Sequence, residues 1–320
     1  MNARPFARLA VAAVTALWIG QASAQDTAIL SAEPRFHPVV ARNGMVSSQE
    51  AIATLVGVDV LRAGGNAVDA AVAVGFALAV TLPRAGNIGG GGFMIVHDAE
   101  ADETVAIDYR ELAPAAATED MFLNDAGDAD PLKSRFSGLG VGVPGTVAGL
   151  ALAHERYGSG QLSWADLIAP AFKLAAEGFP VSDDLASSLA STWTRAHLGR
   201  DAEASRIFYG PTDGPPAAGS IMIRPDLALT LQRIAAEGPS AFYEGPIAEA
   251  IVAKVNSAGG RMSLEDLAGY EPQVREPVTG TYEGYEIVSM PPPSSGGIHL
   301  IQILNILEGC RHHKVPHLVY

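Results

Sequence analysis

Apolar residues near the start of the chain recur at helical spacing. Between residues 52 and 61, isoleucine, leucine and valine return every three or four positions, and Gly64-Gly65 follows. This spacing predicts a helix with an apolar face, and glycine is typical of the end of a helix. The pattern Ser47-x-x-Glu50 predicts a capping box at the start of that helix.

The next segment, Ala67–Leu82, consists almost entirely of alanine, valine, leucine and phenylalanine. A helix that is apolar all round belongs in a protein interior. This one is too short to cross a bilayer, and it contains Asp69. We expect Asn66 to cap its start and Pro83 to end it.

Two short strands are predicted after a glycine-rich stretch. Phe93–His97 and Thr104–Asp108 are separated by an acidic turn, which favours a hairpin. The second strand then carries Arg110 to its far end, before the chain breaks at Pro114.

The centre of the chain, about residues 144–270, is predicted to be a helical block. The helices expected there and beyond are Thr146–Tyr157, a helix opened by Ser163 and Asp166 that ends near Gly178, Leu227–Glu237, Ile247–Val255, a short helix opened by Ser263-x-x-Asp266, and Ile298–Leu307. A further strand, Thr281–Met290, is interrupted by Gly284. Strands near the two ends with helices between them indicate an α+β fold.

Composition and charge narrow the class of protein. The 320 residues are 48% hydrophobic and 18% charged, as in globular proteins. A net charge of −14 argues against nucleic acid and against an anionic membrane surface as partners. The single cysteine excludes an internal disulfide, and no His/Cys cluster has metal-ligand spacing, so we expect no metal site.

The first 24 residues have the pattern of a signal peptide. Arg4 and Arg8 precede a short apolar run, Leu9–Gly20, and small residues follow at 22–24. We therefore expect export to the periplasm or secretion, no membrane span, and a mature chain that begins near Gln25.

Arg110 is the candidate substrate-binding residue. A planar, permanently charged guanidinium is suited to bind a carboxylate through two hydrogen bonds. The alternative is a structural ion pair with neighbouring Asp108 or Glu111.

Other candidate sites carry less weight. The run Gly89–Gly92 follows a helix and precedes a strand, the reverse of a dinucleotide fingerprint, and indicates close backbone approach. The amide groups that follow Pro291–Pro293 are a possible anion site. The sequence contains no Gly-x-Ser-x-Gly motif of a serine nucleophile. Cys310 lies in a basic stretch that is a poor place for a preorganised catalytic nucleophile.

Seven short sequence motifs follow one another in a fixed order along the chain. They are Met45–Ser48, Gly64–Ala70, Gly86–Met94, Asp108–Pro114, Val143–Gly149, Asp266–Tyr270 and Ser289–Gly297. Each is weak alone, but seven in order resemble the large-subunit portion of the gamma-glutamyltranspeptidase family, and the resemblance extends over roughly residues 34–309.

The resemblance implies a fold and an activity. The fold is an N-terminal-nucleophile hydrolase-like four-layer αββα sandwich, incomplete in this chain. The activity is glutathione hydrolysis and transfer of the γ-glutamyl group to amino acids, peptides or water, without a cofactor. In the family, autocatalytic cleavage frees an N-terminal threonine nucleophile on a small subunit. Arg110 matches the family arginine that binds the α-carboxylate of the substrate.

The nucleophile of the family has no counterpart in this sequence. We therefore expect glutathione or another γ-glutamyl compound and a small catalytic subunit as partners, and no activity from this chain alone. We also expect unpaired sheet edges and exposed apolar faces. Residues 310–320 depart from the family pattern, which indicates either a truncated reading or a natural divergent tail. Two other functions remain open: a glutaryl- or cephalosporin-type acylase, and a non-catalytic periplasmic binding remnant.

Overall fold

The computed structural model describes residues 39–210 and 214–312. The chain divides into two units, residues 1–43 and 44–320, and all the elements below belong to the second. The expected signal peptide, residues 1–24, lies outside the described residues. So does most of the expected divergent tail, of which only the backbone of residues 310–312 is described.

The first helix, α2 (Ala51–Arg62), is present but is not capped as expected. Glu50, not Ser47, is the N-cap residue, and its carboxylate accepts hydrogen bonds from the backbone amides of Ile52 (2.9 Å) and Ala53 (2.8 Å). The hydroxyl of Thr81 donates a third bond to Glu50 at 2.8 Å. The predicted Ser47 capping box is therefore wrong, because the longer Glu50 side chain both caps α2 and reaches the end of α3.

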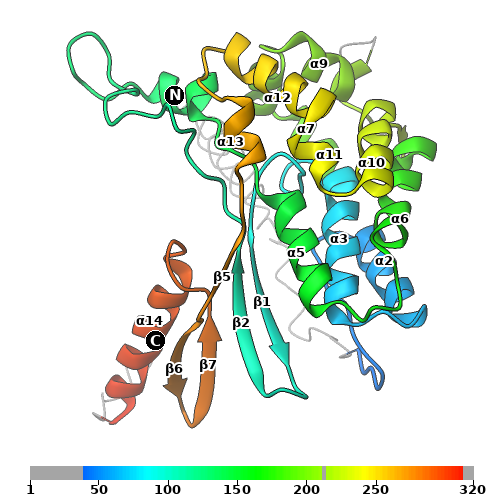
Figure 1. Ribbon diagram of the computed structural model, residues 1–320, viewed down its shortest axis with the longest axis vertical. Coiled ribbons are helices and arrows are strands. Elements are labelled where there is room, and N and C mark those ends of the chain that lie inside the picture. The colour runs from blue at the N-terminus through cyan, green and yellow to red at the C-terminus, as the bar shows by residue number, and fades with distance from the viewer. Residues whose placement is uncertain (1–38, 211–213, 313–320) are drawn as a thin grey trace, which may run out of the picture. The chain divides into compact units, whose positions relative to one another are not determined.

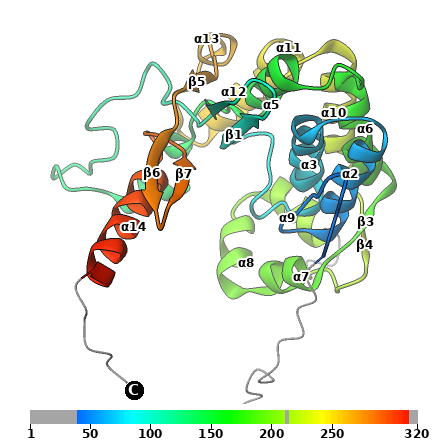
Figure 2. The ribbon, with the colours of Figure 1, turned by 90° about the horizontal axis from the view of Figure 1, so that it is seen from below.

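The apolar helix α3 (Ala67–Thr81) lies in the interior, as its composition predicted. Asn66 caps it in a full capping box with Asp69. It contacts α2, α5 (Thr146–Tyr157) and α6 (Trp164–Glu177) (Figure 2). Phe76 of α3 is fully buried and packs edge-on against Trp164, with ring centroids 5.3 Å apart.

A three-stranded antiparallel sheet stands beside these helices (Figure 1). The predicted hairpin is confirmed as β1 (Phe93–Asp98) and β2 (Glu103–Asp108), and the sheet order is β1-β2-β5. Strand β5 (Gln273–Arg275) was not predicted, because its three residues are all exposed and show no alternation. Its pairing with β2 brings residues about 165 positions apart side by side, with Ile107 opposite Val274.

The predicted helical block is also present. Helix α4 (Pro131–Phe136) and the short helix η1 (Gly138–Gly140) precede it. Its elements, apart from α5 and α6, are β3 (Phe179–Pro180), α7 (Asp183–Ala190), α8 (Thr192–Leu198), α9 (Ala202–Tyr209), β4 (Ile221–Met222), α10 (Pro225–Glu237), α11 (Ser240–Tyr243), α12 (Gly245–Ser257) and α13 (Leu264–Ala268). The capping boxes predicted at Ser163 and Ser263 are both formed. Short helices α4, α7, α8 and α9 were not anticipated.

The last part of the unit is a hairpin covered by a helix. Strands β6 (Val278–Tyr282) and β7 (Tyr285–Ser289) pair in antiparallel fashion, and α14 (Gly296–His312) packs on them. The single interrupted strand expected at Thr281–Met290 is thus wrong. Glu283 and Gly284 adopt positive φ angles of 49° and 84°, which turns the chain back on itself.

The described elements form an α+β fold, as predicted. Helix α14 presents apolar side chains to solvent, among them Ile303 (56% exposed) and Ile306 (64% exposed), so the expected exposed apolar face is present. Within the described ranges, no helix has the length and apolar character needed to cross a membrane.

Candidate functional site

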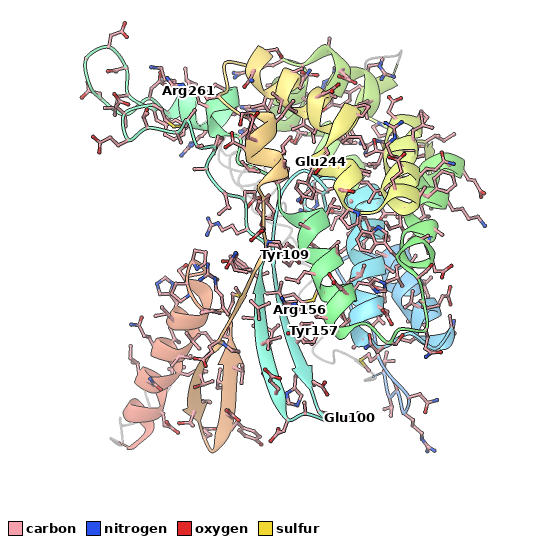
Figure 3. The ribbon with its side chains drawn as sticks, viewed as in Figure 1. Glu100, Tyr109, Arg156, Tyr157, Glu244 and Arg261 are labelled. Atoms are coloured by element: carbon pink, nitrogen blue, oxygen red, sulfur yellow. The ribbon has the colours of Figure 1, made fainter. Side chains whose placement is uncertain are left out.

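Arg110 lies just beyond the end of β2 and connects the two segments that the sequence singled out. Its guanidinium Nη1 donates a hydrogen bond to the carbonyl of Pro293 at 3.3 Å. The contact joins segments 183 positions apart, at the point where Tyr109 leaves the sheet (Figure 3). Arg110 itself is exposed.

The main chain of Arg110 is fixed from both sides. Its amide donates to Oδ1 of Asp108 at 3.1 Å, and its carbonyl accepts from the hydroxyl of Tyr270 at 2.9 Å. Both partners are buried, with 7% and 8% of their surface exposed. The position of the arginine backbone is therefore set by the fold and not by a mobile loop.

Asp108 directs its charge to another arginine. Its Oδ2 accepts from Nε of Arg275, on β5, at 2.8 Å. Within residues 39–210 and 214–312, the guanidinium of Arg110 forms no ion pair with Asp108, Glu111 or any other acid. The ion pair with Asp108 that was weighed as an alternative for Arg110 is thus made by Arg275.

The glycine run permits close packing beneath Arg110. A Cβ on Gly91 would stand 2.5 Å from the carbonyl oxygen of Tyr109 and 2.9 Å from Cα of Arg110. The carbonyl of Gly90 accepts from the amides of Gly145 (2.7 Å) and Thr146 (3.0 Å). The run therefore contacts neighbouring backbone, as predicted, and connects β1 to the start of α5.

Tyr109 fills the space between this run and α5. A Cβ on Gly149 would lie 2.1 Å from Cγ of Tyr109, so the ring packs directly on the helix backbone. Burial raises the pKa of Tyr109 to about 12, and the phenol is therefore neutral at physiological pH.

Arg110 also lines a cavity of about 400 Å³. It is lined by Arg110, Glu111, Leu112, Ala113, Pro114, Ala117, Thr118, Met121, Phe122, Leu139, Gly140, Val141 and Gly142. Arg110 supplies its cation and Glu111 an exposed carboxylate. A cavity with both charges at its border suits a small zwitterion.

The Pro291–Gly297 segment is a turn that leads into α14. The amide of Ser294 donates to the carbonyl of Pro291 at 3.1 Å, and the hydroxyl of Ser294 accepts from the amide of Gly296 at 3.2 Å. One of the amides considered for an anion is therefore already occupied by Ser294. The turn contacts Arg110 through the carbonyl of Pro293, which accepts a hydrogen bond from the guanidinium.

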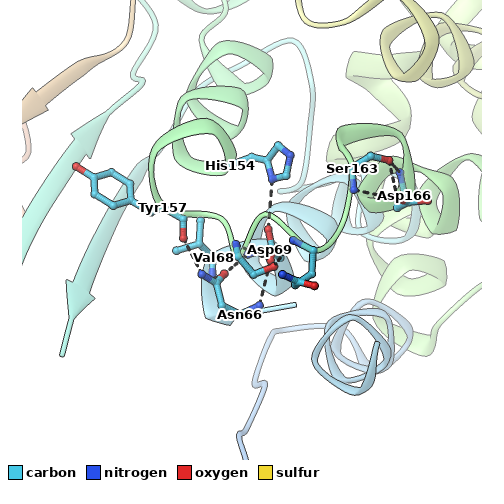
Figure 4. Close-up of polar contacts among 9 residues, drawn as sticks. Asn66, Val68, Asp69, His154, Tyr157, Ser163 and Asp166 are labelled. Carbon is cyan, nitrogen blue, oxygen red and sulfur yellow. Dashed lines mark hydrogen bonds and ion pairs between the residues drawn. The ribbon is translucent and has the colours of Figure 1, made fainter. Parts of the chain in front are cut away.

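The histidine nearest a buried acid belongs to a structural network. His154 of α5 lies 3.3 Å from Oδ1 of Asp69, which is fully buried (Figure 4). Asp69 also accepts from the amides of Asn66 and Ser159, each at 3.0 Å. Half-buried His154 therefore takes part in a structural hydrogen-bond network. Among the described residues, no group of three His, Cys, Asp or Glu side chains is placed to hold a metal ion.

Tyr270 and Arg275 are the site residues that the sequence did not identify. Tyr270 appears there only as the end of the Asp266–Tyr270 segment, and Arg275 in an undistinguished polar stretch. Their roles arise because β5 pairs with β2. A long-range strand pairing of this kind leaves no local signal in the sequence.

Comparisons with known proteins identify the family of the chain. The family model described as Gamma-glutamyltranspeptidase matches residues 53–318. The glutathione hydrolase proenzyme of Escherichia coli (strain K12) is 52% identical over 276 residues, covering 86% of this chain and 47% of that protein. The chain spans about half the length of the curated relatives it matches.

Solved structures give the same result. The crystal structure of Helicobacter pylori gamma-glutamyltranspeptidase matches with a TM-score of 0.81 and 44% identity, covering 85% of this chain and 77% of that one. The cephalosporin acylase from Bacillus halodurans matches with a TM-score of 0.73 and 29% identity, covering 88% and 53%. The family model covers most of the chain, and the first of these structures matches over more than two thirds of its own length; the chain belongs to the gamma-glutamyltranspeptidase family.

Proposed function

We propose that this chain is the substrate-binding, large-subunit part of a gamma-glutamyltransferase and glutathione hydrolase. Arg110 would bind the α-carboxylate of a γ-glutamyl compound such as glutathione. The observation that carries the proposal is the guanidinium of Arg110, which is exposed, forms no ion pair among the described residues and is mounted on a fixed backbone. Catalytic sites require such preorganised positioning groups.

In the proposed reaction this chain holds the glutamyl end while another polypeptide breaks the amide bond. The hydroxyl of an N-terminal threonine on a small catalytic subunit attacks the γ-carbonyl carbon, and its α-amino group takes the hydroxyl proton. The amine of the leaving group receives that proton, and an ester links the glutamyl group to threonine. An amino acid, a peptide or water then attacks the ester and regenerates the hydroxyl. The proenzyme names of the relatives support a partner produced by cleavage.

The signal-peptide pattern of residues 1–24 supports a further part of the proposal, that the protein acts in the periplasm or outside the cell. Glutathione hydrolysis there would require no cofactor, because the nucleophile and its base reside on one threonine.

Calorimetric titration with glutamate and with glutathione tests the binding step on this chain. We expect Arg110→Gln to weaken binding by about tenfold or more, because a charge-assisted bidentate contact is lost. Arg110→Lys should recover only part of the affinity, since an ammonium lacks the planar fork. Arg62→Gln, a change in an exposed arginine of α2 that pairs with Asp59, is the control. Equal affinity of wild type and Arg110→Gln would refute the proposed site.

Activity on a γ-glutamyl anilide tests the partner. We expect no turnover by the purified chain, and turnover when it is co-expressed with the portion of the Escherichia coli proenzyme that it does not match. Turnover by the chain alone would show that its nucleophile lies within these 320 residues.

The similarity to a cephalosporin acylase supports a second candidate, hydrolysis of a glutaryl-type amide. Both substrate classes carry a carboxylate for Arg110, but only the γ-glutamyl group has an α-ammonium. Comparing co-expressed complexes on glutathione and on a glutaryl amide separates the two. Binding of glutamate that persists without turnover on either substrate would favour the binding remnant.

A further inference from the structure

A second cavity, of about 610 Å³, lies among the helices of the central block. None of its lining residues is shared with the cavity beside Arg110. Leu185, Ser188 and Leu189 of α7 line it, and both leucines are buried. Its other lining residues come from the turn after α3, the end of α4, and helices α8 and α9.

Three aromatic rings are stacked along this cavity. The ring of His197 lies 4.1 Å from that of Trp193 and 4.5 Å from that of Phe136, between centroids, and both interplanar angles are 29°. Trp193 and His197 are one helical turn apart on α8, whereas Phe136 comes from the end of α4. The stack therefore depends on tertiary packing.

The central ring is held in one orientation. Nδ1 of His197 lies 2.6 Å from the carbonyl oxygen of Trp193, and because a carbonyl only accepts, Nδ1 carries the hydrogen. Trp193, at the end of the stack, is 67% exposed. A large part of the indole surface is thus open, next to a positioned ring that limits its movement.

One arginine contacts the stack and two others line the cavity. The guanidinium of Arg200 lies 5.0 Å from the centroid of Phe136, and Arg84 is neutralised by Asp184 at 2.6 Å. Arg135 lines the cavity, is exposed, and makes no ion pair with any described residue. On a chain with a net charge of −14 the overall field repels anions, so the binding of an anion here must rely on the local charge of Arg135.

We propose that this cavity binds a small planar aromatic anion, with its ring stacked on Trp193 and its acidic group on Arg135. The open indole face favours a flat ring over an aliphatic chain, since offset stacking adds to the burial of apolar area. The unpaired guanidinium favours a carboxylate or sulfonate over a neutral group. The site is distinct from the proposed γ-glutamyl site and does not depend on it.

Three matched probes test the proposal by calorimetry on the full chain. They are 2-naphthoate, naphthalene-2-carboxamide as its neutral counterpart, and cyclohexanecarboxylate as an aliphatic anion. We expect 2-naphthoate to bind at least about tenfold more tightly than either of the others. Arg135→Gln should remove the advantage over the carboxamide, and Trp193→Ala should weaken both aromatic probes. Arg62→Gln should change nothing.

Two outcomes overturn the proposal. One is equal binding of all three probes, or 2-naphthoate binding that survives both Trp193→Ala and Arg135→Gln. The other is concentration-dependent self-association that Trp193→Ala abolishes, because a second copy of the chain would then cover the stack. Analytical sedimentation detects such self-association. Circular dichroism checks that each variant is folded, and Trp193→Leu replaces Trp193→Ala if the latter is not.

Discussion

The hydroxyl of Tyr270 donates a hydrogen bond of 2.9 Å to the backbone carbonyl of Arg110, although 160 positions separate the two residues. The ring of Tyr270 stacks on Tyr243, with centroids 5.9 Å apart and an interplanar angle of 6°. The hydroxyl of Tyr243 in turn accepts from the amide of Ala148, at the start of α5. The candidate binding residue is thus connected through two phenols to the core helices.

Removing the Tyr270 hydroxyl tests this connection. Burial raises the pKa of Tyr270, with Tyr243 and Asp108 adding to the effect, so the phenol remains a neutral donor across the physiological range. We expect Tyr270→Phe to lower the free energy of unfolding by about 1–2 kcal/mol, because the Arg110 carbonyl loses its partner. Urea denaturation measures the loss.

The control for this change is Tyr285→Phe, since Tyr285 is 73% exposed and should tolerate the loss of its hydroxyl. A Tyr270→Phe protein as stable as wild type, with unchanged affinity for glutamate, would show that the bond does not position Arg110.

Two glycines of one run should respond differently to alanine. A Cβ on Gly91 would meet the carbonyl of Tyr109 at 2.5 Å, whereas a Cβ on Gly89 has no atom within 4 Å. We expect Gly91→Ala to destabilise the protein by about 1–3 kcal/mol through overpacking and to disturb the backbone of Arg110. Gly89→Ala should be nearly neutral. Thermal unfolding of both proteins checks this, and equal effects would contradict the close approach.

Local signals in the sequence were enough to locate most of the long helices. The capping boxes at Ser163 and Ser263 and the N-cap role of Asn66 are formed as predicted, because the partners in each lie only two or three residues apart. Where a long-range contact competed, the prediction failed. Glu50 caps α2 in place of Ser47 because Thr81, 31 positions away, supplies an additional hydrogen bond to its carboxylate.

The site was predictable only in part, for the same reason. Arg110 stands out by charge and by position after a strand, but the partners that fix it come from elsewhere in the chain. Arg275 reaches Asp108 because the short strand β5 joins the edge of β2. Its three exposed residues have no apolar alternation from which that pairing could be inferred.

The ion pair between Asp108 and Arg275 should contribute to stability more than a surface pair does. Asp108 is buried, while the Arg275 side chain is 40% exposed, so solvent screens part of the interaction. We expect Arg275→Met to cost about 1–2 kcal/mol, because the carboxylate of Asp108 is left in the protein without its cation. Arg62→Met, in a pair whose side chains are 73% and 71% exposed, should cost much less. Urea denaturation at low salt compares the two variants, because urea adds no ions that would screen the pairs. Equal losses in the free energy of unfolding would argue that Asp108 is effectively solvated.

The buried carboxylate of Asp69 should make stability depend on pH in the acid range. Burial by itself raises the pKa of Asp69, but hydrogen bonds from Ser159, Asn66 and His154 together outweigh it and lower the pKa below its usual value of 3.8. The stabilisation is therefore fully present above about pH 4 and is lost as the pH falls through the lower, folded-state pKa.

Substitution by asparagine isolates this contribution. We expect Asp69→Asn to lower the free energy of unfolding by about 2 kcal/mol at pH 7, since an amide nitrogen does not accept from the Ser159 backbone. The gap between wild type and variant should begin to shrink below about pH 4, where Asp69 of the unfolded chain takes up a proton, and should close once the pH passes the lower pKa of the native carboxyl. Asp166→Asn is the matched control, because Asp166 holds the same capping position on α6 but is exposed (Figure 4). Urea melts at pH 7, 5, 4 and 3 provide the comparison. A gap for Asp69→Asn that stays constant over this series would mean that the ionised form of Asp69 gains nothing from its three donors.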